Sequence, residues 1–278
     1  MLRRVLIQNT KVTTDRAGRE VITLRDADTD GLPPGRARIG SPYDLDARWG
    51  GKRDLISYGY KLHISESCDA TPPAAPVDRA NWVPDQPPNL ITNVATTDAS
   101  VPDAAMTAPI HTDLHRKDVL PARHYLDSGY PSADLLVSSL TRFGIRLVTP
   151  MLADTSPQAR AGDGFDRTHF HVDWQARTVT CPQQQTTTGW HPASQRGTEV
   201  IVVQFPTEVC HACPVRAKCT TATRHGRQLT LRPQAVQQAL DAARTEQTTP
   251  GWQRDYALRA GVEATIAQAT KVTDARRA

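Results

Sequence analysis

The order of hydrophobic and polar residues along the chain predicts short strands that alternate with helices. Residues 58–66 alternate between apolar and polar side chains, and residues 90–97 are rich in β-branched side chains. Both patterns are typical of strands, so together they predict a hairpin with a long connecting loop. The same criteria predict further strands at residues 4–8, 124–130, 146–149, 170–174, 179–182, 199–205 and 228–231.

Helical patterns occupy residues 106–115, 132–143, 233–245 and 250–271. The last stretch is predicted to be one helix: Pro250 suits a first helical turn, and only Gly261 weakens the run. The order strand, helix, strand between residues 124 and 149 indicates an α/β fold with helices on the faces of a sheet. Polar stretches rich in Gly or Pro at 13–50 and 68–89 are expected to be loops.

Composition restricts the class of protein. The chain has 278 residues, of which 38% are hydrophobic, enough for one large or two small domains. No run of about eighteen apolar residues exists that could span a membrane, and the N-terminus has no secretion signal. We therefore expect a cytoplasmic protein, in which cysteines are more often metal ligands than disulfides.

Positive charge is concentrated at the C-terminal end. The chain carries a net charge of +4, whereas residues 216–278 hold eleven Lys and Arg against five Asp and Glu, a net +6. A basic segment of this kind suits a polyanionic partner such as nucleic acid. On charge alone, a solvated basic surface without a partner fits equally well.

A group of cysteines has the spacing of a metal knuckle. It combines a C-x2-C pair with one later and one earlier thiol: Cys181, Cys210, Cys213 and Cys219. Four thiolates satisfy tetrahedral zinc, so we expect a structural Zn²⁺ or iron site. His211 and His225 are alternative ligands, and Cys68 is expected to be unpaired. The simpler interpretation is a set of reduced thiols without a metal.

Two carboxylates stand where a reaction centre is expected. Asp127 ends a predicted strand just before Gly129, and functional groups gather at the carboxyl ends of strands in open α/β sheets. Glu263 lies on the predicted C-terminal helix, four residues after Arg259. Together the two carboxylates can bind a hard divalent cation. Taken singly, Asp127 also fits a turn residue, and Glu263 fits an ordinary helix ion pair.

Short motifs around these carboxylates carry a family resemblance. The D-x-G-Y motif at 127–130 resembles the segment around the second catalytic Asp of bacterial insertion-sequence DDE transposases. The Y-x2-R-x3-E motif at 256–263 is similar to the signature around their catalytic Glu. The cysteines lie between the two motifs, as in one branch of the family, and residues 58–103 resemble the family's second and third strands.

The resemblance implies both a fold and a reaction. It implies an α/β, ribonuclease H-like mixed sheet with flanking helices, interrupted by a cysteine-rich insertion and incomplete at the first strand. It also implies metal-dependent DNA cleavage and strand transfer in transposition, with Asp127 and Glu263 binding Mg²⁺ or Mn²⁺. The expected DNA contacts are Tyr256, Arg259 and Lys271. The family's basic residue falls at Thr270, one position before Lys271.

The same resemblance suggests a division of the chain and its partners. Four segments are expected, namely a loop-rich segment at 1–57, the first part of the core at 58–165, the β-rich cysteine insertion at 166–232, and the C-terminal helices at 233–278. The expected partners are the DNA ends of the insertion sequence, the target DNA, and a second copy of the chain in a homodimer.

One catalytic position of the family has no counterpart in the expected place. The family's first catalytic Asp lies in an apolar strand, whereas Asp44 and Asp46 stand among Gly, Ser and Pro and are expected to be turn residues. We therefore expect a transposase fragment, cut at both ends, with impaired activity. The alternatives are a non-catalytic nucleic-acid-binding module with a structural metal knuckle, and a decayed product that does not fold stably.

Overall fold

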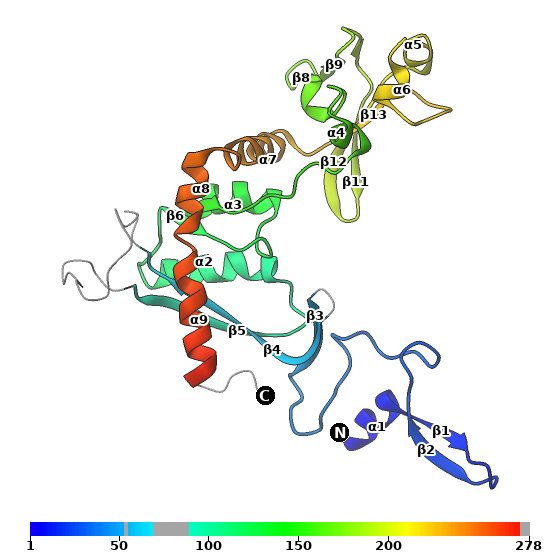
Figure 1. Cartoon of the computed structure of the whole chain (residues 1–278), viewed down its shortest axis with the longest axis vertical. Coiled ribbons are helices and arrows are strands. Elements are labelled where there is room, and N and C mark those ends of the chain that lie inside the picture. The colour runs from blue at the N-terminus through cyan, green and yellow to red at the C-terminus, as the bar shows by residue number, and fades with distance from the viewer. Residues whose placement is uncertain (53–54, 69–88, 273–278) are drawn as a thin grey trace. The chain divides into compact units, whose positions relative to one another are not determined.

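The computed structural model describes residues 1–52, 55–68 and 89–272. It divides the chain into two compact units: unit 1 is formed by Met1–Tyr130 with Arg254–Ala278, and unit 2 by Pro131–Gln253 (Figure 1). Each unit contains both helices and strands, so the chain is α/β as predicted. The strands form several small sheets, and the finer ribonuclease H-like arrangement stays a prediction.

Unit 1 begins with a helix where the sequence predicted a strand. Helix α1 covers Leu2–Asn9, so the strand predicted at residues 4–8 is wrong. The apolar run Val5-Leu6-Ile7 is continuous, and periodicity alone does not separate a strand from a helix in so short a run. The side chains of Asn9 and Thr10 donate hydrogen bonds back to the carbonyl oxygens of Val5 and Leu6, which closes the last helical turn.

An antiparallel hairpin follows α1. Its strands are β1 (Thr10–Thr14) and β2 (Glu20–Leu24). Both lie in or next to the stretch predicted to be loop, because Asp15 and Gly18 supply a tight turn between two β-branched runs. The aspartates that follow do form turns, as expected; Asp26 accepts hydrogen bonds from the backbone N–H groups of Asp28 and Thr29.

The main sheet of unit 1 has three antiparallel strands in the order β3-β4-β5. Their bounds are Arg48–Lys52, Leu55–Glu66 and Ile91–Asp98. The predicted hairpin is confirmed, with Tyr60 paired to Asp98 and His63 paired to Ala95. Most of the loop predicted at residues 68–89 lies outside the described residues.

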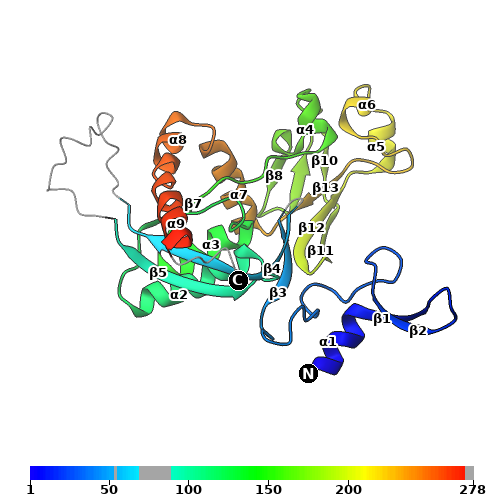
Figure 2. The same cartoon turned by 60° about the horizontal axis from the view of Figure 1, so that its bottom comes forward.

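Two helices that lie far apart in the sequence pack against strands of this sheet. A short 3₁₀ turn, η2 (Asp103–Met106), leads into α2 (Thr107–Arg116), which packs against β5 and confirms the helix predicted at 106–115. Strand β6 (Arg123–Tyr125) follows. The C-terminal helix α9 (Ala260–Val272) packs against β4 (Figure 2).

Unit 2 is built from two small antiparallel sheets and several helices. The helices are α3 (Ala133–Phe143), α4 (Pro157–Ala161), the 3₁₀ turn η3 (Arg167–His169), α5 (Thr207–His211), α6 (Arg216–Cys219) and α7 (Gln234–Glu246). The strands are β7 (Arg146–Val148), β8 (His171–Asp173), β9 (Thr178–Thr180), β10 (Thr186–Thr187), β11 (Trp190–Gln195), β12 (Thr198–Gln204) and β13 (Gln228–Leu231). The two sheets have the orders β10-β9-β8 and β11-β12-β13.

The core of unit 2 lies between its two sheets. It consists of Phe170, Val179, Val203, Phe205, Leu229 and Leu231. In β13 the residues alternate between exposed and buried, so Leu229 and Leu231 face this core while the polar residues beside them face solvent. The strands predicted at 170–174, 179–182, 199–205 and 228–231 are therefore confirmed, and the first two pair as a hairpin.

Two helices replace the single C-terminal helix predicted from the sequence. Helix α8 covers Pro250–Ala257 and carries the chain from unit 2 back into unit 1, and α9 begins at Ala260. At the break, Leu258 and Arg259 donate backbone hydrogen bonds three residues back, to Asp255 and Tyr256. Gly261, a poor helix former, lies directly after this break, which lowers the stability of a continuous helix there.

None of the helices within the described parts of the chain is long and apolar enough to cross a bilayer.

Two histidines of unit 1 form a pair in which one ring is fully buried and the other half-buried. His111 of α2 is fully buried, and its Nε2 lies 3.0 Å from Nδ1 of His124 in β6. Burial lowers the pKa of each imidazole from 6.5 to about 4, and for His124 the neighbouring His111 adds to this effect. Both rings are therefore neutral at pH 7, and the N–H of one donates a hydrogen bond to the ring nitrogen of the other.

This pair makes the stability of unit 1 dependent on pH. Because the folded pKa lies below the unfolded value of 6.5, protons bind the unfolded chain more tightly, and stability is lost as the pH falls from 6.5 to about 4. We expect the free energy of unfolding to drop by on the order of 3 kcal/mol across this range. Urea unfolding at several pH values measures it. The variant His124→Asn should flatten the profile, whereas His191→Asn, which changes an exposed histidine, should not.

Candidate functional site

An open groove of about 370 Å³ lies entirely within unit 1. Its walls come from β4, from the segment after β5, from β6 with the turn that follows, and from α9. Three carboxylates line it: Asp103, Asp127 and Glu263. The groove therefore brings together the two carboxylates that the sequence singled out, and it adds a third.

Asp127 follows strand β6 and the buried residue Leu126. Its Oδ1 atom accepts a hydrogen bond of 2.7 Å from the backbone N–H of Ser128, and its carbonyl accepts the N–H of Tyr130 at 3.0 Å. Asp127 therefore does form a turn, as the simpler interpretation held. Since the same half-buried residue also lines the groove, the two interpretations are compatible.

Glu263 lies in the first turn of α9 and is the more exposed of the two carboxylates. Its side chain is 63% exposed, and its Oε1 accepts a hydrogen bond of 2.6 Å from Nη2 of Arg259. The Arg259 guanidinium also lies 5.5 Å from the ring centre of Tyr256. The three residues of the second motif therefore contact one another in sequence order, although Tyr256 lies in α8, Arg259 in the break between the helices, and Glu263 in α9.

Tyr256 links the C-terminal helices to the strand end that carries Asp127. Its hydroxyl donates a hydrogen bond of 3.3 Å to the carbonyl oxygen of Leu126. A second link joins Asp255 to Arg123 of β6 at 2.6 Å. Burial raises the pKa of the Tyr256 phenol, so the hydroxyl keeps its proton and remains a donor. These two contacts place the second motif beside the first.

The turn after Asp127 contacts two residues that the sequence analysis did not identify, Asp103 and His63. Asp103 forms an ion pair of 3.0 Å with Lys61, whose Nζ also donates to the carbonyl of Val101 at 2.7 Å. A Cβ atom at Gly129 would lie 2.9 Å from the Asp103 carboxylate, so the absence of a side chain at Gly129 permits this close approach.

On the other side of the turn, a buried histidine meets Tyr130. Nδ1 of His63 lies 2.6 Å from the Tyr130 hydroxyl, and its Nε2 lies 3.2 Å from the hydroxyl of Thr97. Burial lowers the pKa of His63 and raises the pKa of Tyr130 to about 12. Both side chains are therefore neutral at pH 7. For the side of the groove formed by β4, the sequence indicated only that positions 61 and 63 share a face of a strand.

Other predicted residues lie outside the groove. Lys271 is exposed in the last turn of α9 and does not line it. Asp44 accepts hydrogen bonds from the backbone N–H groups of Asp46 and Ala47, which confirms a turn there, and it also accepts from the hydroxyl of Tyr60 at 2.7 Å. Asp44 and Asp46 do not line the groove either.

The carboxylates do not form a metal site as they stand. Among the residues that the structure describes, no three His, Cys, Asp or Glu side chains are placed so that they could hold one metal ion. Carboxylate oxygens are the ligands that Mg²⁺ prefers, but that ion demands near-octahedral placement. The chemistry of the donors therefore suits Mg²⁺, whereas their arrangement does not.

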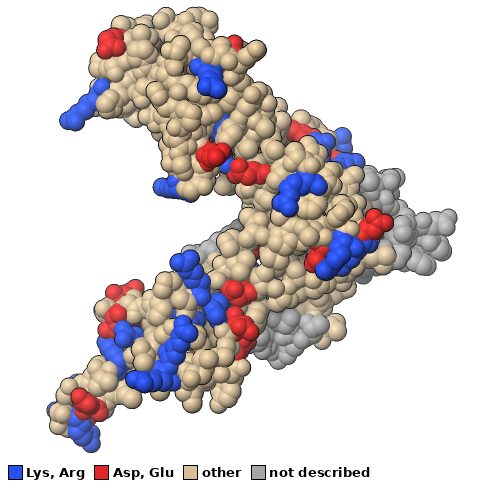
Figure 3. Space-filling view, turned by 180° about the vertical axis from the view of Figure 1, so that it is seen from behind, with Lys and Arg blue, Asp and Glu red and all other residues tan. Residues whose placement is uncertain are grey.

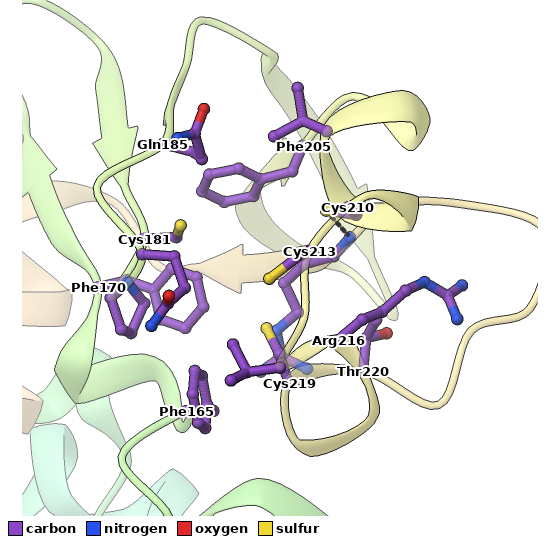
Figure 4. A pocket seen from close by; sticks show the side chains of 15 residues that line it. Phe165, Phe170, Cys181, Gln185, Phe205, Cys210, Cys213, Arg216, Cys219 and Thr220 are labelled. Carbon is purple, nitrogen blue, oxygen red and sulfur yellow. Dashed lines mark hydrogen bonds between the residues drawn. The ribbon is translucent and has the colours of Figure 1, made fainter.

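The four cysteines of the predicted knuckle gather elsewhere, within unit 2. Cys181, Cys210, Cys213 and Cys219 line one small pocket (Figure 4). His211 and His225, the alternative ligands, are exposed and do not line it. Cys68 forms no disulfide.

Positive and negative side chains are mixed on the surface. On the face drawn in Figure 3, Lys and Arg are interspersed with Asp and Glu. Several cations of the basic C-terminal segment are paired, among them Arg232 with Asp134 and Arg259 with Glu263. Part of the positive charge of that segment is therefore offset by acidic side chains.

One known family matches the C-terminal part of the chain. Residues 180–278 match the sequence model of a family described as transposase DDE domain. The matched part contains the four clustered cysteines and the Y-x2-R-x3-E motif, and it supports a DDE transposase. No curated protein and no solved structure matches the chain.

Adding a side chain at Gly129 tests whether the close contact between this turn and the Asp103 carboxylate stabilises unit 1. In Gly129→Ala the new methyl group meets the Asp103 carboxylate, so we expect stability to fall by about 1 kcal/mol in urea unfolding. In the background Asp103→Ala, the same substitution should have almost no effect, because the carboxylate is gone and the remaining Cβ lies at an ordinary contact distance of 3.7 Å.

Gly251→Ala is the matched control for this experiment. That glycine is exposed in α8 and its Cβ would meet only the Thr249 hydroxyl at 4.0 Å, so alanine there should be neutral or stabilising. An equal loss for Gly129→Ala in both backgrounds would contradict the proposed contact.

Proposed function

We propose that this chain acts on DNA as a DDE-type transposase, cleaving phosphodiester bonds and transferring the strand ends during transposition of an insertion sequence. The observation that carries the proposal is the meeting of Asp127 and Glu263 in one groove, with Arg259 and Tyr256 beside them. The family match at residues 180–278 supports the same class of reaction.

The residues of the groove suit a phosphodiester substrate in three ways. Arg259 presents a planar guanidinium, which matches the geometry of a phosphate group. Lys61 of β4 adds a second cation to the lining, held by Asp103. Asp127 and Glu263 supply negative charge where a nucleophilic water molecule or a DNA 3′-hydroxyl would have to lose its proton. In this proposal Tyr256 and Arg259 hold the DNA backbone.

The proposal carries further expectations about cofactor and fold. DDE transposases generally use a divalent cation such as Mg²⁺, but the described residues do not form its site, so no step of the reaction is derived through it. A ribonuclease H-like arrangement of the strands, a DNA contact by Lys271 and a homodimer stay predictions.

A second candidate function is DNA binding without catalysis. It is favoured by one observation: Glu263 is mostly exposed and occupied by Arg259, as in an ordinary helix ion pair. In that case the basic C-terminal residues bind DNA and the carboxylates are structural. Both functions predict binding that weakens steeply with salt, because cations released from the DNA backbone drive it.

Isosteric amides separate the two functions. Asp127→Asn and Glu263→Gln keep the shape of each side chain and remove its charge, so under the first function each should lower DNA cleavage at least about a hundredfold. Cleavage is measured with labelled duplex DNA that carries the ends of the encoding element, in the presence of Mg²⁺ or Mn²⁺. DNA affinity of the amide variants should stay within a few-fold of the unaltered chain.

The control for this experiment is Glu20→Gln, which removes a carboxylate from the exposed hairpin of the same unit and should leave cleavage unchanged. If the unaltered chain binds the DNA but does not cut it with either ion, the catalytic function is wrong and the binding function is supported.

A further inference from the structure

The cysteine cluster of unit 2 has no part in the function proposed above. Its members come from three segments: Cys181 follows β9, Cys210 and Cys213 lie in and after α5, and Cys219 ends α6. All four line the same pocket (Figure 4). Thiols separated by as much as Cys181 and Cys219 meet here because the fold brings them together.

Tight backbone turns carry the cysteines that line this pocket. The turn after β9 is closed by hydrogen bonds from the N–H of Cys181 to the carbonyl of Gln185, at 2.8 Å, and from Gln184 back to Cys181, at 2.9 Å. In the C-x2-C segment, Cys213 donates to the carbonyl of Cys210 at 3.3 Å. Two loops that each present sulfur from a tight turn are typical of a thiolate metal knuckle.

A backbone donor supports one of the sulfurs. The N–H of Arg227 donates a hydrogen bond to Sγ of Cys210 at 3.2 Å. Donors of this kind orient a metal-binding thiolate and stabilise its negative charge. The approach depends on Gly226, which is buried: a Cβ there would clash with the carbonyl oxygen of Phe205. The chain therefore uses a glycine to bring a donor to the sulfur.

The pocket has the size and walls of a closed structural site. Its volume of about 30 Å³ has room for one small ion. Aromatic residues form its walls, with Phe165 8%, Phe170 4% and Phe205 1% exposed. In Figure 4 the sulfur atoms of Cys213 and Cys219 face the side on which Cys181 lies. All four cysteines are half-buried and none is in a disulfide.

The segment that carries three of the thiols needs a stabilising link. Helix α5 has five residues and α6 has four, too short to be stable in isolation. Only Phe205 from the stretch 205–227 belongs to the buried core of unit 2, while Cys210 and Cys219 pack against that core from outside. A metal ion bound at these positions would tie the segment to the sheets.

We propose that Cys181, Cys210, Cys213 and Cys219 bind one Zn²⁺ as thiolates, in a tetrahedral site that fastens residues 205–227 to unit 2. In the present side-chain conformations, no three of these cysteines are placed so that they could bind one metal ion. Binding therefore turns the sulfurs inward about their Cα–Cβ bonds, between staggered rotamers, without moving the turns that carry them. The protons of the four thiols leave to solvent as the ion binds.

Metal content after dialysis tests this site directly. The full-length chain, produced without a histidine tag, is loaded with Zn²⁺, dialysed extensively and analysed for metal. We expect about one zinc ion per chain. Replacement by Co²⁺ should give the visible absorption of tetrahedral cobalt thiolate. Less than about half an ion per chain, or iron in place of zinc, would overturn the proposal.

Single substitutions identify the ligands. Each of Cys181→Ser, Cys210→Ser, Cys213→Ser and Cys219→Ser should lower zinc affinity at least about tenfold. The matched control Cys68→Ser changes a thiol of unit 1 and should bind zinc like the unaltered chain. Full affinity in the four variants would overturn the assignment.

Thiol labelling covers the case in which a variant does not fold. In the unaltered protein, Zn²⁺ should protect four thiols from an alkylating reagent and leave Cys68 reactive, and a chelator should restore the reactivity of all of them. Equal labelling with and without zinc would contradict the site. These readouts do not involve DNA, so they are independent of the outcome of the cleavage experiment.

Discussion

The hydroxyl of Tyr256 donates its hydrogen bond to Leu126 across 130 positions of sequence. Unit 1 depends on this contact and on the Arg123–Asp255 ion pair beside it, because its C-terminal helices are separated from the rest of the unit by all of unit 2. Exposed ion pairs contribute at most about 1 kcal/mol, and a hydrogen bond contributes a similar amount. The packing of α9 on β4 must therefore supply the remaining stability.

An inserted unit of this kind has to hold together by itself. Chain closure around a long insertion adds little, because its entropic cost rises only slowly with length. What matters is whether the insertion has a core, and unit 2 has one between its two sheets. Of residues 205–227, which contain the short helices α5 and α6, only Phe205 belongs to that core. Three of the four clustered cysteines lie in this poorly packed segment. Unit 1 is therefore stabilised by contacts between segments distant in sequence, whereas unit 2 contains a segment that requires an additional stabilising contact.

Sequence patterns predicted the elements with a clear period and missed those without one. The hairpin of β4 and β5 and helices α3 and α7 follow from alternation or helical spacing alone. Helix α1 was missed because three consecutive apolar residues fit either structure. The break before α9 was missed because helix propensity is a weak local preference, and the docking of Tyr256 on Leu126 acts on it from a distance.

The candidate site was predictable only in part for the same reason. Asp127 and Glu263 were found by their motifs, and each also has an ordinary local role, as a turn residue and as a helix ion pair. The walls formed by Asp103 and by His63 with Tyr130 involve partners that lie far apart in the sequence, and periodicity gives the face of a strand but not what lies opposite.

Charge in the groove is nearly balanced before any substrate binds. Lys61 is paired with Asp103, and Arg259 is paired with Glu263. In the proposed function, a DNA phosphate that binds Arg259 takes the place of the Glu263 carboxylate, and this exchange requires little free energy because the Glu263 side chain is 63% exposed to solvent. Under this proposal, substrate binding is therefore coupled through Arg259 to the release of the Glu263 carboxylate.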